Sequence, residues 1–532
     1  MSSAVHNVGG WTSRWAATAP RRLAIVDGRL RLDWAAFDER VGRAAGWLAA
    51  AGVARGDRVA LLLGNRAAYL ELVLASARLG AIAVPTNTRL SAREIAFQVD
   101  DARPRVLVAE RAFASLVADA LAAAAHAPAR VALLGDDPDD AFERERAAAP
   151  AIDALPVSPD APMMILYTSG TTGAPKGALL AHRKTLFNAL NAQLYFGIRS
   201  GAERVLVAVP LFHSLGLKIL SLPALYAGCA VVLQRGFDAD AVWRAVERER
   251  ITYLGGVPTQ YERLLGALDA GACPPGARPA LRFLFTAGAA IAPDTVRAYE
   301  RHGLVLKQGY GQTETSILCC LDEADALRKA GSVGRPVFHA ELRVVDRATV
   351  DAAPAHWRDV GTGETGEIVV RGPIAMLGYW ERPAETAATL REGWVRTGDL
   401  ARIDDEGFVT LVGRAREMYI SGGENVYPAE VEAALLAHPA VDEVAVVGVP
   451  DATWGESGCA FVVLAPGAEL DLAALLAWCG DRLARYKQPR HLVVAAELPR
   501  TASGKVRKHE LLAQLGAAAG TDGALASSAL GS

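Results

Sequence analysis

Cysteine is scarce in this sequence, and none of the cysteines lies in a metal-binding pattern. Six occur among 532 residues, and they lack the paired spacing of a zinc site: Cys229, Cys273, Cys319, Cys320, Cys459 and Cys479. The adjacent pair, Cys319 and Cys320, is interpreted as packing rather than redox chemistry. This usage favours a reducing compartment, and we expect a cytoplasmic protein.

Long apolar runs and an excess of one charge are also missing. The first twenty residues contain no apolar segment typical of a signal peptide, and no run of about 18 apolar residues occurs, so we expect no transmembrane segment. Lys and Arg total 56 against 59 Asp and Glu, a net charge of -3. This balance argues against nucleic acid as a partner bound by bulk electrostatics.

The order of apolar segments predicts an α/β fold. Strand-like runs at 59–63, 81–85 and 105–108 alternate with helical patterns at 67–79 and 91–99, which is typical of a doubly wound parallel sheet. We predict a large N-terminal domain of doubly wound sheets (1–413), which includes a small β-rich subdomain (about 333–412). A small α+β C-terminal domain (414–515) and a disordered low-complexity tail (516–532) follow.

One loop carries the clearest chemical signal. Residues 167–177 read YTSGTTGAPKG and follow a short apolar run, 163–166, that is expected to be a buried strand. Glycines allow close backbone approach to an anion, hydroxyls donate hydrogen bonds, and Lys176 supplies a positive charge. The loop is therefore expected to hold phosphate rather than to be a plain polar surface loop. It is not a Walker A loop, because Gly177 follows the lysine and the glycine spacing differs.

Two later segments supply groups that nucleotide chemistry needs. Residues 308–314 read QGYGQTE and offer a flat aromatic ring, Tyr310, and a carboxylate, Glu314, which near a phosphate loop is a natural Mg²⁺ ligand. Asp399, in TGDL, is suited to accept hydrogen bonds from ribose hydroxyls. Either segment alone is weak, because a glycine-flanked acid is usually part of a turn.

Seven motifs in order resemble the adenylate-forming superfamily of acyl-CoA synthetases, adenylation domains and luciferases. They are YTSGTTGAPKG (167–177), PLFHSLGL (210–217), TAGAAI (286–291), QGYGQTET (308–315), TGDL (397–400), GRAREMYISGGENVYPAE (413–430) and PRTASGKVRK (499–508). The resemblance implies an ATP-dependent reaction in which a small-molecule carboxylic acid forms an acyl-adenylate and releases pyrophosphate. A thiol, expected to be coenzyme A, then displaces AMP. Nothing in the sequence requires a homodimer or excludes one.

The resemblance also implies roles for individual residues. The pyrophosphate moiety would be held by Thr168, Ser169, Gly170, Thr171, Thr172, Gly173 and Lys176. The adenine would lie among Gly288, Ala289, Ala290, Gln308, Gly309, Tyr310 and Gly311. Thr313 would touch the α-phosphate, Glu314 would bind Mg²⁺, Asp399 and Arg414 would hold the ribose, and Lys505 would bridge the carboxylate and the α-phosphate. His213 is included among the catalytic candidates, and Gly422 and Gly423 would line the pantetheine path.

The family rotates its C-terminal domain between the two half-reactions. Here Arg416-Glu417 stands where Lys-Asp is usual, and Glu417 is the expected hinge. Acetylation of Lys505 would remove the charge that the reaction needs. Two rival interpretations stay open: transfer of the acyl group to a carrier protein or its hydrolysis, and a catalytically dead nucleotide-binding paralogue. The second would require loss of Lys505, Glu314 or Asp399, and all three are in place.

The acid is expected to be a medium- or long-chain fatty acid, with an aryl or hydroxycinnamic acid as the alternative. Its pocket would be lined by residues 212–218, 253–259, 286–290 and 309–317, where several glycines predict depth. No arginine stands beside Tyr310, which argues against a dicarboxylate such as malonate. Lys218 either extends outward from a helix into solvent or meets a polar distal group of the substrate.

Overall fold

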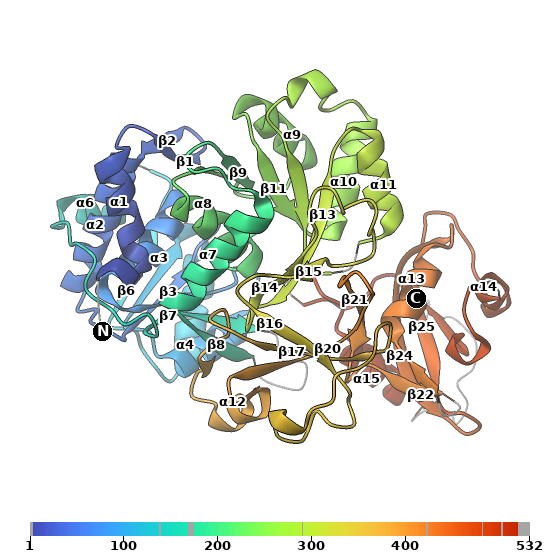
Figure 1. Cartoon of the computed structure of the whole chain (residues 1–532). Helices are drawn as coiled ribbons and strands as arrows, with labels where there is room; N and C mark the ends of the chain where they lie inside the picture. The colour runs from blue at the N-terminus through green and yellow to red at the C-terminus, as the bar shows by residue number, and fades with distance from the viewer. Residues whose placement is uncertain are drawn as a thin grey trace.

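Four β-sheets organise the computed structural model, which describes residues 4–137, 140–168, 175–289, 291–421, 424–480, 482–501 and 504–519 (Figure 1). Two large sheets come from the N-terminal two thirds of the chain. A smaller sheet follows, and a fourth belongs to a C-terminal unit on one side of the molecule. Among the described helices, none combines the length and the apolar character needed to cross a bilayer.

The first large sheet has seven strands in the order β18-β8-β7-β4-β3-β5-β6. Its strands are β3 (Arg58–Leu62), β4 (Ile82–Pro85), β5 (Val106–Glu110), β6 (Arg130–Leu134), β7 (Pro162–Thr168), β8 (Lys176–Ala181) and β18 (Gly378–Tyr379). Strands β3 to β7 are parallel, whereas β8 and β18 pair antiparallel at one edge. The predicted parallel sheet is therefore present, with an antiparallel edge added.

The second large sheet has nine strands in the order β15-β14-β13-β12-β11-β9-β10-β1-β2. Its strands are β1 (Leu23–Asp27), β2 (Leu30–Asp33), β9 (Arg204–Val207), β10 (Ala230–Leu233), β11 (Tyr253–Gly256), β12 (Phe283–Thr286), β13 (Leu306–Gln312), β14 (Ser316–Cys320) and β15 (Arg335–Pro336). The central strands run parallel, and β2, β14 and β15 are antiparallel. The carboxyl ends of β11, β12 and β13 therefore meet at one edge, where ligands of such sheets bind.

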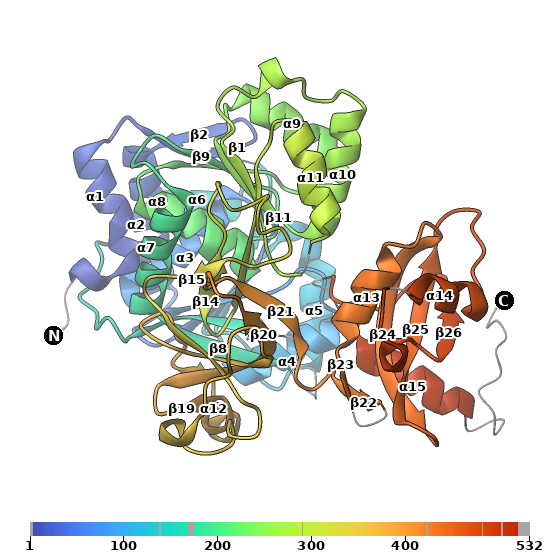
Figure 2. The same cartoon turned by 45° about the vertical axis from the view of Figure 1, so that its right-hand side comes forward.

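Helices separate the two sheets and cover their outer faces. The large shared core contains Val59 and Leu61 of β3, Val205 of β9 and residues of α2 (Trp34–Ala50), α3 (Ala67–Leu79), α7 (His182–Phe196) and α8 (Leu222–Tyr226). Alternate residues of β3 face a separate core formed with α4 (Ala92–Ala102) and α5 (Ala114–Ala123). Figure 2 shows α9 (Ala239–Arg248), α10 (Pro258–Asp269) and α11 (Pro293–Arg301) on the outer side of the second sheet.

Local signals explain where the helices begin and end. Helix α3 is buried on every side and stops at Gly80, whose φ of +67° is a left-handed conformation that glycine adopts without strain. Helix α4 begins with a capping box between Ser91 and Glu94. The remaining N-terminal helices are α1 (Trp11–Thr18) and α6 (Ala141–Ala148). The helix predicted at 67–79 is confirmed in full.

The predicted β-rich subdomain is mostly one small sheet. It consists of β16 (Glu341–Val345), β17 (Gly366–Arg371), β19 (Leu390–Arg391), β20 (Trp394–Ile403) and β21 (Val409–Arg414) and carries α12 (Pro383–Thr389). Two strands from the same stretch, β15 and β18, belong instead to the large sheets. The segment 333–412 is therefore not self-contained, because its strands complete the edges of both larger sheets.

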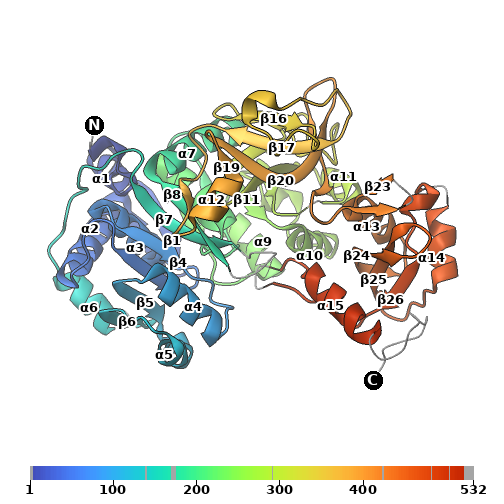
Figure 3. The ribbon, with the colours of Figure 1, turned by 90° about the horizontal axis from the view of Figure 1, so that it is seen from below.

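The C-terminal unit has its own sheet and cores. It contains β22 (Tyr419–Ser421), β23 (Glu424–Val426), β24 (Val441–Asp451), β25 (Gly455–Leu464) and β26 (His491–Val494), with α13 (Pro428–Leu436), α14 (Leu472–Cys479) and α15 (Lys508–Ala519). Seen from below, α15 lies on the side that faces the large domain (Figure 3). The domain boundary at 413–414 stays a prediction.

Two predictions of local structure were wrong, and one strand was not predicted. The stretch 397–400 was expected to be a glycine turn, but it lies inside the long strand β20. The tail was predicted to be disordered from residue 516, yet α15 continues to Ala519, and residues 520–532 lie outside the described part. A strand directly after the phosphate loop, β8, was not predicted, because its small residues resemble the start of the helix that follows.

Burial of His182 predicts acid sensitivity of the fold. His182 accepts a hydrogen bond from the backbone N–H of Val8 at 3.1 Å, and burial lowers its pKa to about 4. Below pH 6.5 the unfolded chain binds a proton that the folded chain does not, so stability falls as the pH decreases toward 4. At pH 5 this costs about 2 kcal/mol. We expect His182→Gln to show a smaller drop in melting temperature between pH 7.5 and pH 5 than the wild type. Equal drops would contradict this assignment.

Candidate active site

The predicted phosphate loop connects the two strands of a β-hairpin. Strands β7 and β8 pair antiparallel, with Thr168 opposite Lys176, and the Thr168 hydroxyl donates to the Lys176 carbonyl at 3.3 Å. The loop therefore returns into a strand and not into a helix, unlike a Walker A loop. The predicted pyrophosphate-binding residues Ser169, Gly170, Thr171, Thr172 and Gly173 lie outside the described residues.

Tyr379 connects the end of this loop to the predicted magnesium ligand. The Lys176 ammonium group lies 5.4 Å from the centre of the Tyr379 ring, and the Tyr379 hydroxyl donates to Glu314 Oε1 at 2.9 Å. Lys176 and Glu314, which come from different sheets, thus contact the same aromatic side chain, one over its ring and the other at its hydroxyl. The sequence analysis missed Tyr379, because it lies 65 residues from Glu314 and in none of the motifs.

Thr313 and Glu314 occupy the turn between β13 and β14. The turn is closed by hydrogen bonds between Gln312 and Thr315, in which the Thr315 N–H donates to the Gln312 carbonyl at 3.2 Å and the Thr315 hydroxyl accepts from the Gln312 N–H at 3.3 Å. Both Thr313 and Glu314 are half-buried. The turn thus presents a hydroxyl and a carboxylate side by side at the end of a central strand.

Asp399 is the centre of a buried hydrogen-bond network. Its carboxylate accepts from the Tyr310 hydroxyl at 2.5 Å and from Gln312 Nε2 at 2.6 Å, and Arg414 Nε lies 2.6 Å from its other oxygen. Burial and the Asp399 charge raise the pKa of Tyr310, which therefore stays protonated and donates. Asp399 and Arg414 face each other across the β20–β21 pair. The structure places these two residues in direct contact, and their role in holding the ribose stays a prediction.

The predicted adenine slot contains an unpaired acceptor. Gln308 is buried, and its Oε1 has no hydrogen-bond partner within the described part of the chain. Gly288 has a φ of +94°, and the nearest atom to a Cβ built there is a Val257 methyl at 3.9 Å. Gly288 and Ala289 are exposed, so space is open beside them, while Ala290 lies outside the described residues. An amino donor such as that of adenine would satisfy Gln308.

The neighbouring glycines Gly309 and Gly311 are required by packing. A Cβ on Gly309 would lie 2.6 Å from the Phe285 ring, and one on Gly311 would lie 1.9 Å from the Ser316 carbonyl oxygen. Both positions must therefore be glycine for the β13–β14 hairpin to pack. A direct role in nucleotide binding is untested for either residue.

Two glycines in the predicted acid pocket, Gly255 and Gly256, do not provide depth. A Cβ on Gly255 would meet Leu220 at 2.9 Å, and one on Gly256 would meet Gln260 and Tyr261 at 3.1 and 3.2 Å. The space that these glycines leave is filled by neighbouring side chains. The expectation of a deep pocket at these two positions was therefore wrong.

His213 is a neutral side chain near the same region. Burial, together with the positive charges of Arg89 and Lys505, lowers its pKa to about 4, so at pH 7 it is uncharged. Its Nε2 is buried and has no hydrogen-bond partner among the described residues. A neutral imidazole with an open nitrogen can orient a substrate without adding charge.

Lys505 reaches this site from the C-terminal unit. Removal from water and the nearby Arg414 charge lower its pKa, and the carboxylates of Asp399 and Glu314 act in the opposite direction. The backbone of Lys505 is held by Thr501, whose N–H donates to the Lys505 carbonyl at 2.7 Å. The Lys505 side chain is still in contact with solvent. Charged groups from both the large domain and the C-terminal unit thus act on one another at this site.

The predicted hinge residue, Glu417, is paired inside the C-terminal unit. Lys508 Nζ lies 3.2 Å from Glu417 Oε2 and 2.7 Å from Glu432 Oε1, and these two acids raise the pKa of Lys508 against the effect of burial. The Ala415 N–H donates to the carbonyl of Gly398 in β20 at 2.9 Å. The hinge role of Glu417 stays a prediction. Gly422 and Gly423 lie outside the described residues.

One interpretation of the sequence, that Lys218 extends outward into solvent, was wrong. Lys218 lies in the π-helix η4 (Leu215–Ser221), is 1 % exposed, and donates to the Ser316 hydroxyl at 3.1 Å. Burial lowers its pKa to about 7. A contact with the substrate stays untested.

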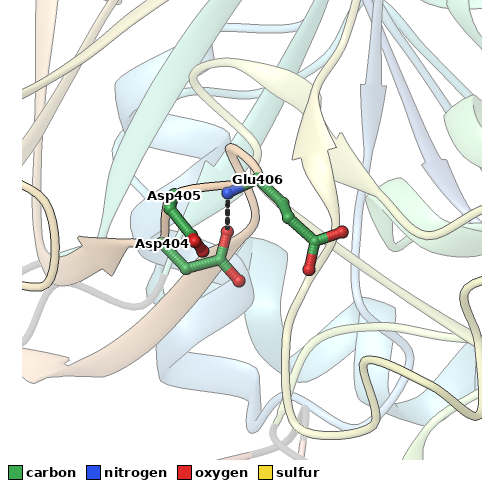
Figure 4. Close-up of side chains that lie close together, drawn as sticks. All are labelled: Asp404, Asp405 and Glu406. Atoms are coloured by element: carbon green, nitrogen blue, oxygen red, sulfur yellow. Dashed lines mark hydrogen bonds between the residues drawn. The ribbon is translucent and has the colours of Figure 1, made fainter.

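An acidic cluster between β20 and β21 does not suit a metal ion. Asp404, Asp405 and Glu406 lie together in the turn after β20, where the Glu406 N–H donates to Asp404 (Figure 4). Lys329 Nζ already lies 2.7 Å from Asp404 and 2.5 Å from Glu406. The lysine occupies the position that a cation would take.

Comparison with known proteins identifies the class of this chain. Residues 12–380 match the AMP-binding enzyme family, and residues 430–505 match the C-terminal domain of AMP-binding enzymes. The chain belongs to this family, the adenylate-forming superfamily, and within it to the CoA-ligase branch. It is an ATP-dependent acid–CoA ligase, whose substrates are a small carboxylic acid, ATP and CoA.

Individual relatives differ in the acid that their names specify. The chain is 41% identical over 517 residues to a feruloyl-CoA synthase of an Amycolatopsis species, covering 96% of this chain and 99% of the relative. It is 41% identical to an indoleacetate–CoA ligase of Aromatoleum aromaticum (94% and 96%) and 36% identical to a long-chain-fatty-acid–CoA ligase of Mycobacterium tuberculosis (96% and 98%). The o-succinylbenzoate CoA synthetase of Bacillus subtilis, solved with ATP and magnesium ion, superimposes with a TM-score of 0.83 at 32% identity (94% and 99%).

Proposed function

We propose that this ligase activates an aromatic carboxylic acid, of the aryl or hydroxycinnamic type, and that the residues assigned above form its ATP site. Two relatives at 41% identity are named for acids that carry an aromatic ring, whereas the long-chain fatty-acid relative is 36% identical. The structure supports a shorter acid, because neighbouring side chains fill the space beside Gly255 and Gly256. This reverses the preference drawn from the sequence.

The ATP site is proposed from the convergence of three groups. The carboxylates of Asp399 and Glu314 both act electrostatically on Lys505. This supports the proposal that a single ligand contacts all three residues. Asp399 with Arg414 would hold the ribose, Gln308 would accept from the adenine amino group, and Thr313 would donate to the α-phosphate. Lys176 and Thr168 would hold the pyrophosphate. These positive and donor groups would stabilise the charge that develops as the acid attacks phosphorus.

Glu314 fits a magnesium ion. Its carboxylate is a hard oxygen ligand, it accepts a hydrogen bond from the Tyr379 hydroxyl, and Lys176 lies over the ring of the same tyrosine. A bound Mg²⁺ would supply positive charge that neutralises the phosphate oxygens. The protein contributes the orientation of the carboxylate through the Tyr379 hydroxyl.

A substrate screen tests the acid. AMP release that depends on CoA is measured with ferulic, indoleacetic, benzoic, octanoic, palmitic and malonic acids. We expect kcat/KM for the preferred aromatic acid to exceed that for either fatty acid by about tenfold or more, which corresponds to about 1.4 kcal/mol. A preference for octanoic or palmitic acid would overturn the aromatic assignment and restore the fatty-acid alternative, which the 36% identical relative supports. Product formation independent of CoA would indicate a carrier protein or water as the acceptor.

A further inference from the structure

A buried polar stripe on α7 contacts the turn that carries the catalytic Thr313 and Glu314. Lys184, Asn188 and Asn191 are spaced four and three residues apart, so they share one face of the helix, and all three are almost fully buried. Helix faces in a core are usually apolar, because burying a polar group is unfavourable unless it is hydrogen-bonded. The partners of this stripe therefore indicate its purpose.

Three hydrogen-bond acceptors surround the Lys184 amino group. Its Nζ donates to the Glu314 carbonyl at 3.1 Å, to the Ser316 hydroxyl at 2.9 Å and, over a short distance, to the Ile374 carbonyl. These contacts anchor the amino group between two segments of the chain. The lysine thus joins the backbone of Glu314 to a different segment of the chain, which begins at Ile374.

That second segment holds both ends of Glu314. The Met376 N–H donates to the Glu314 carbonyl at 2.8 Å, and the Tyr379 hydroxyl donates to the Glu314 carboxylate at 2.9 Å. The segment is itself anchored, because the Leu377 N–H donates to the Leu179 carbonyl of β8 at 2.9 Å. Lys184 therefore contacts the Glu314 backbone and also Ile374, at the start of the segment whose Tyr379 holds the Glu314 carboxylate.

Ser316 is held on the far side of the turn by the same stripe. Its φ of +62° is a left-handed conformation that a serine rarely adopts, so its neighbours must maintain it. Lys184 and Lys218 both donate to its hydroxyl, at 2.9 and 3.1 Å, and the Ile317 N–H that follows donates to Asn188 Oδ1 at 3.2 Å. The turn is thus fixed at Glu314 by Lys184 and just beyond it by Lys184, Lys218 and Asn188.

We propose that Lys184 is a positioning residue for the Glu314 carboxylate, and that it acts through the Glu314 and Ile374 carbonyls and the Ser316 hydroxyl. The inference rests on the proposed role of Glu314 as the magnesium ligand. Lys184 itself touches neither nucleotide nor acid. Partners of this kind behind a metal ligand typically change metal affinity by about 10- to 100-fold when they are removed.

The test compares variants by their magnesium requirement. Lys184→Met keeps the length of the side chain and removes its donors. We expect the Mg²⁺ concentration for half-maximal ATP–pyrophosphate exchange to rise about tenfold, while KM for the acid stays within about twofold of the wild type. Calorimetry of ATP binding with and without Mg²⁺ is the readout that does not depend on activity, and the tightening by Mg²⁺ should be reduced. Lys184→Gln, which keeps an N–H donor, should recover most of the loss.

Controls separate positioning from stability and from the role of Glu314. Asn191→Leu alters the same stripe at its contact with His339, away from the turn, and should leave the Mg²⁺ requirement unchanged. If Lys184→Met does not fold, Ser316→Ala should show a smaller shift, of about threefold, in the same direction. A wild-type Mg²⁺ requirement in the folded Lys184→Met or in Ser316→Ala overturns the proposal. A wild-type requirement in Glu314→Gln instead overturns the magnesium role of Glu314.

Discussion

Replacement of Lys505 by alanine is expected to abolish adenylate formation and to spare the second half-reaction. The Lys505 charge lies in the field of Asp399 and Glu314, where two anions, the acid and the α-phosphate, would meet. Loss of one such group costs about 10²- to 10³-fold in rate when it acts on the transition state. Thioester formation from a chemically prepared acyl-adenylate should stay within about twofold of the wild type, because no phosphate is then attacked.

The measurement is ATP–pyrophosphate exchange for the first half-reaction and CoA-thioester release from preformed adenylate for the second. Lys487→Ala is a matched control, since this lysine is also in the C-terminal unit but pairs with Glu430 at 2.6 Å. The Lys487→Ala variant should keep a rate of adenylate formation within about twofold of the wild type, because a partly exposed ion pair contributes little. Equal losses in both half-reactions of Lys505→Ala would mean that its role is misassigned. Acetylation of Lys505 should reproduce the alanine result, since it removes the same charge.

Replacement of Asp399 by asparagine is expected to weaken ATP binding by about 10- to 100-fold. The carboxylate accepts from Tyr310 and Gln312 and pairs with Arg414, all at 2.5 to 2.6 Å, and hydrogen bonds to a charged group contribute about 1.5–3 kcal/mol each. The variant loses the charge-assisted acceptor for ribose and leaves the Arg414 cation without its partner. KM for ATP should therefore rise, whereas KM for the acid should change by about threefold or less.

The control for Asp399 lies in the same small sheet. Glu341 forms an exposed pair with Arg371 at 2.5 Å between β16 and β17, and Glu341→Gln should change KM for ATP by about twofold or less. A matching rise in KM for ATP and for the acid in Asp399→Asn would indicate a general loss of structure. An unchanged KM for ATP would contradict the ribose assignment.

The local character of most elements could be predicted from short-range patterns. Helix α3 has the predicted bounds, because a helical period is complete within a few residues. Strand β8 and the 397–400 segment were missed for the opposite reason. Their strand conformation depends on pairing with β7 and with β17 and β21, which lie elsewhere in the chain.

The candidate site also combines features that the sequence indicated with features that depend on the tertiary structure. The motifs that contain Lys176, Glu314, Asp399 and Lys505 indicate the chemistry through their resemblance, taken together and in order, to the adenylate-forming superfamily. The sequence by itself therefore determined the family and the reaction type of this protein.

Only the tertiary structure decided which side chains support the residues of the candidate site. Tyr379 orients Glu314, Gln312 joins Asp399, and Lys184 lies behind the turn, because these contacts span 65, 87 and 130 residues and no local pattern encodes them. The structure also decided that Gly255 and Gly309 are glycines for close packing, which depends on where Leu220 and Phe285 lie in space.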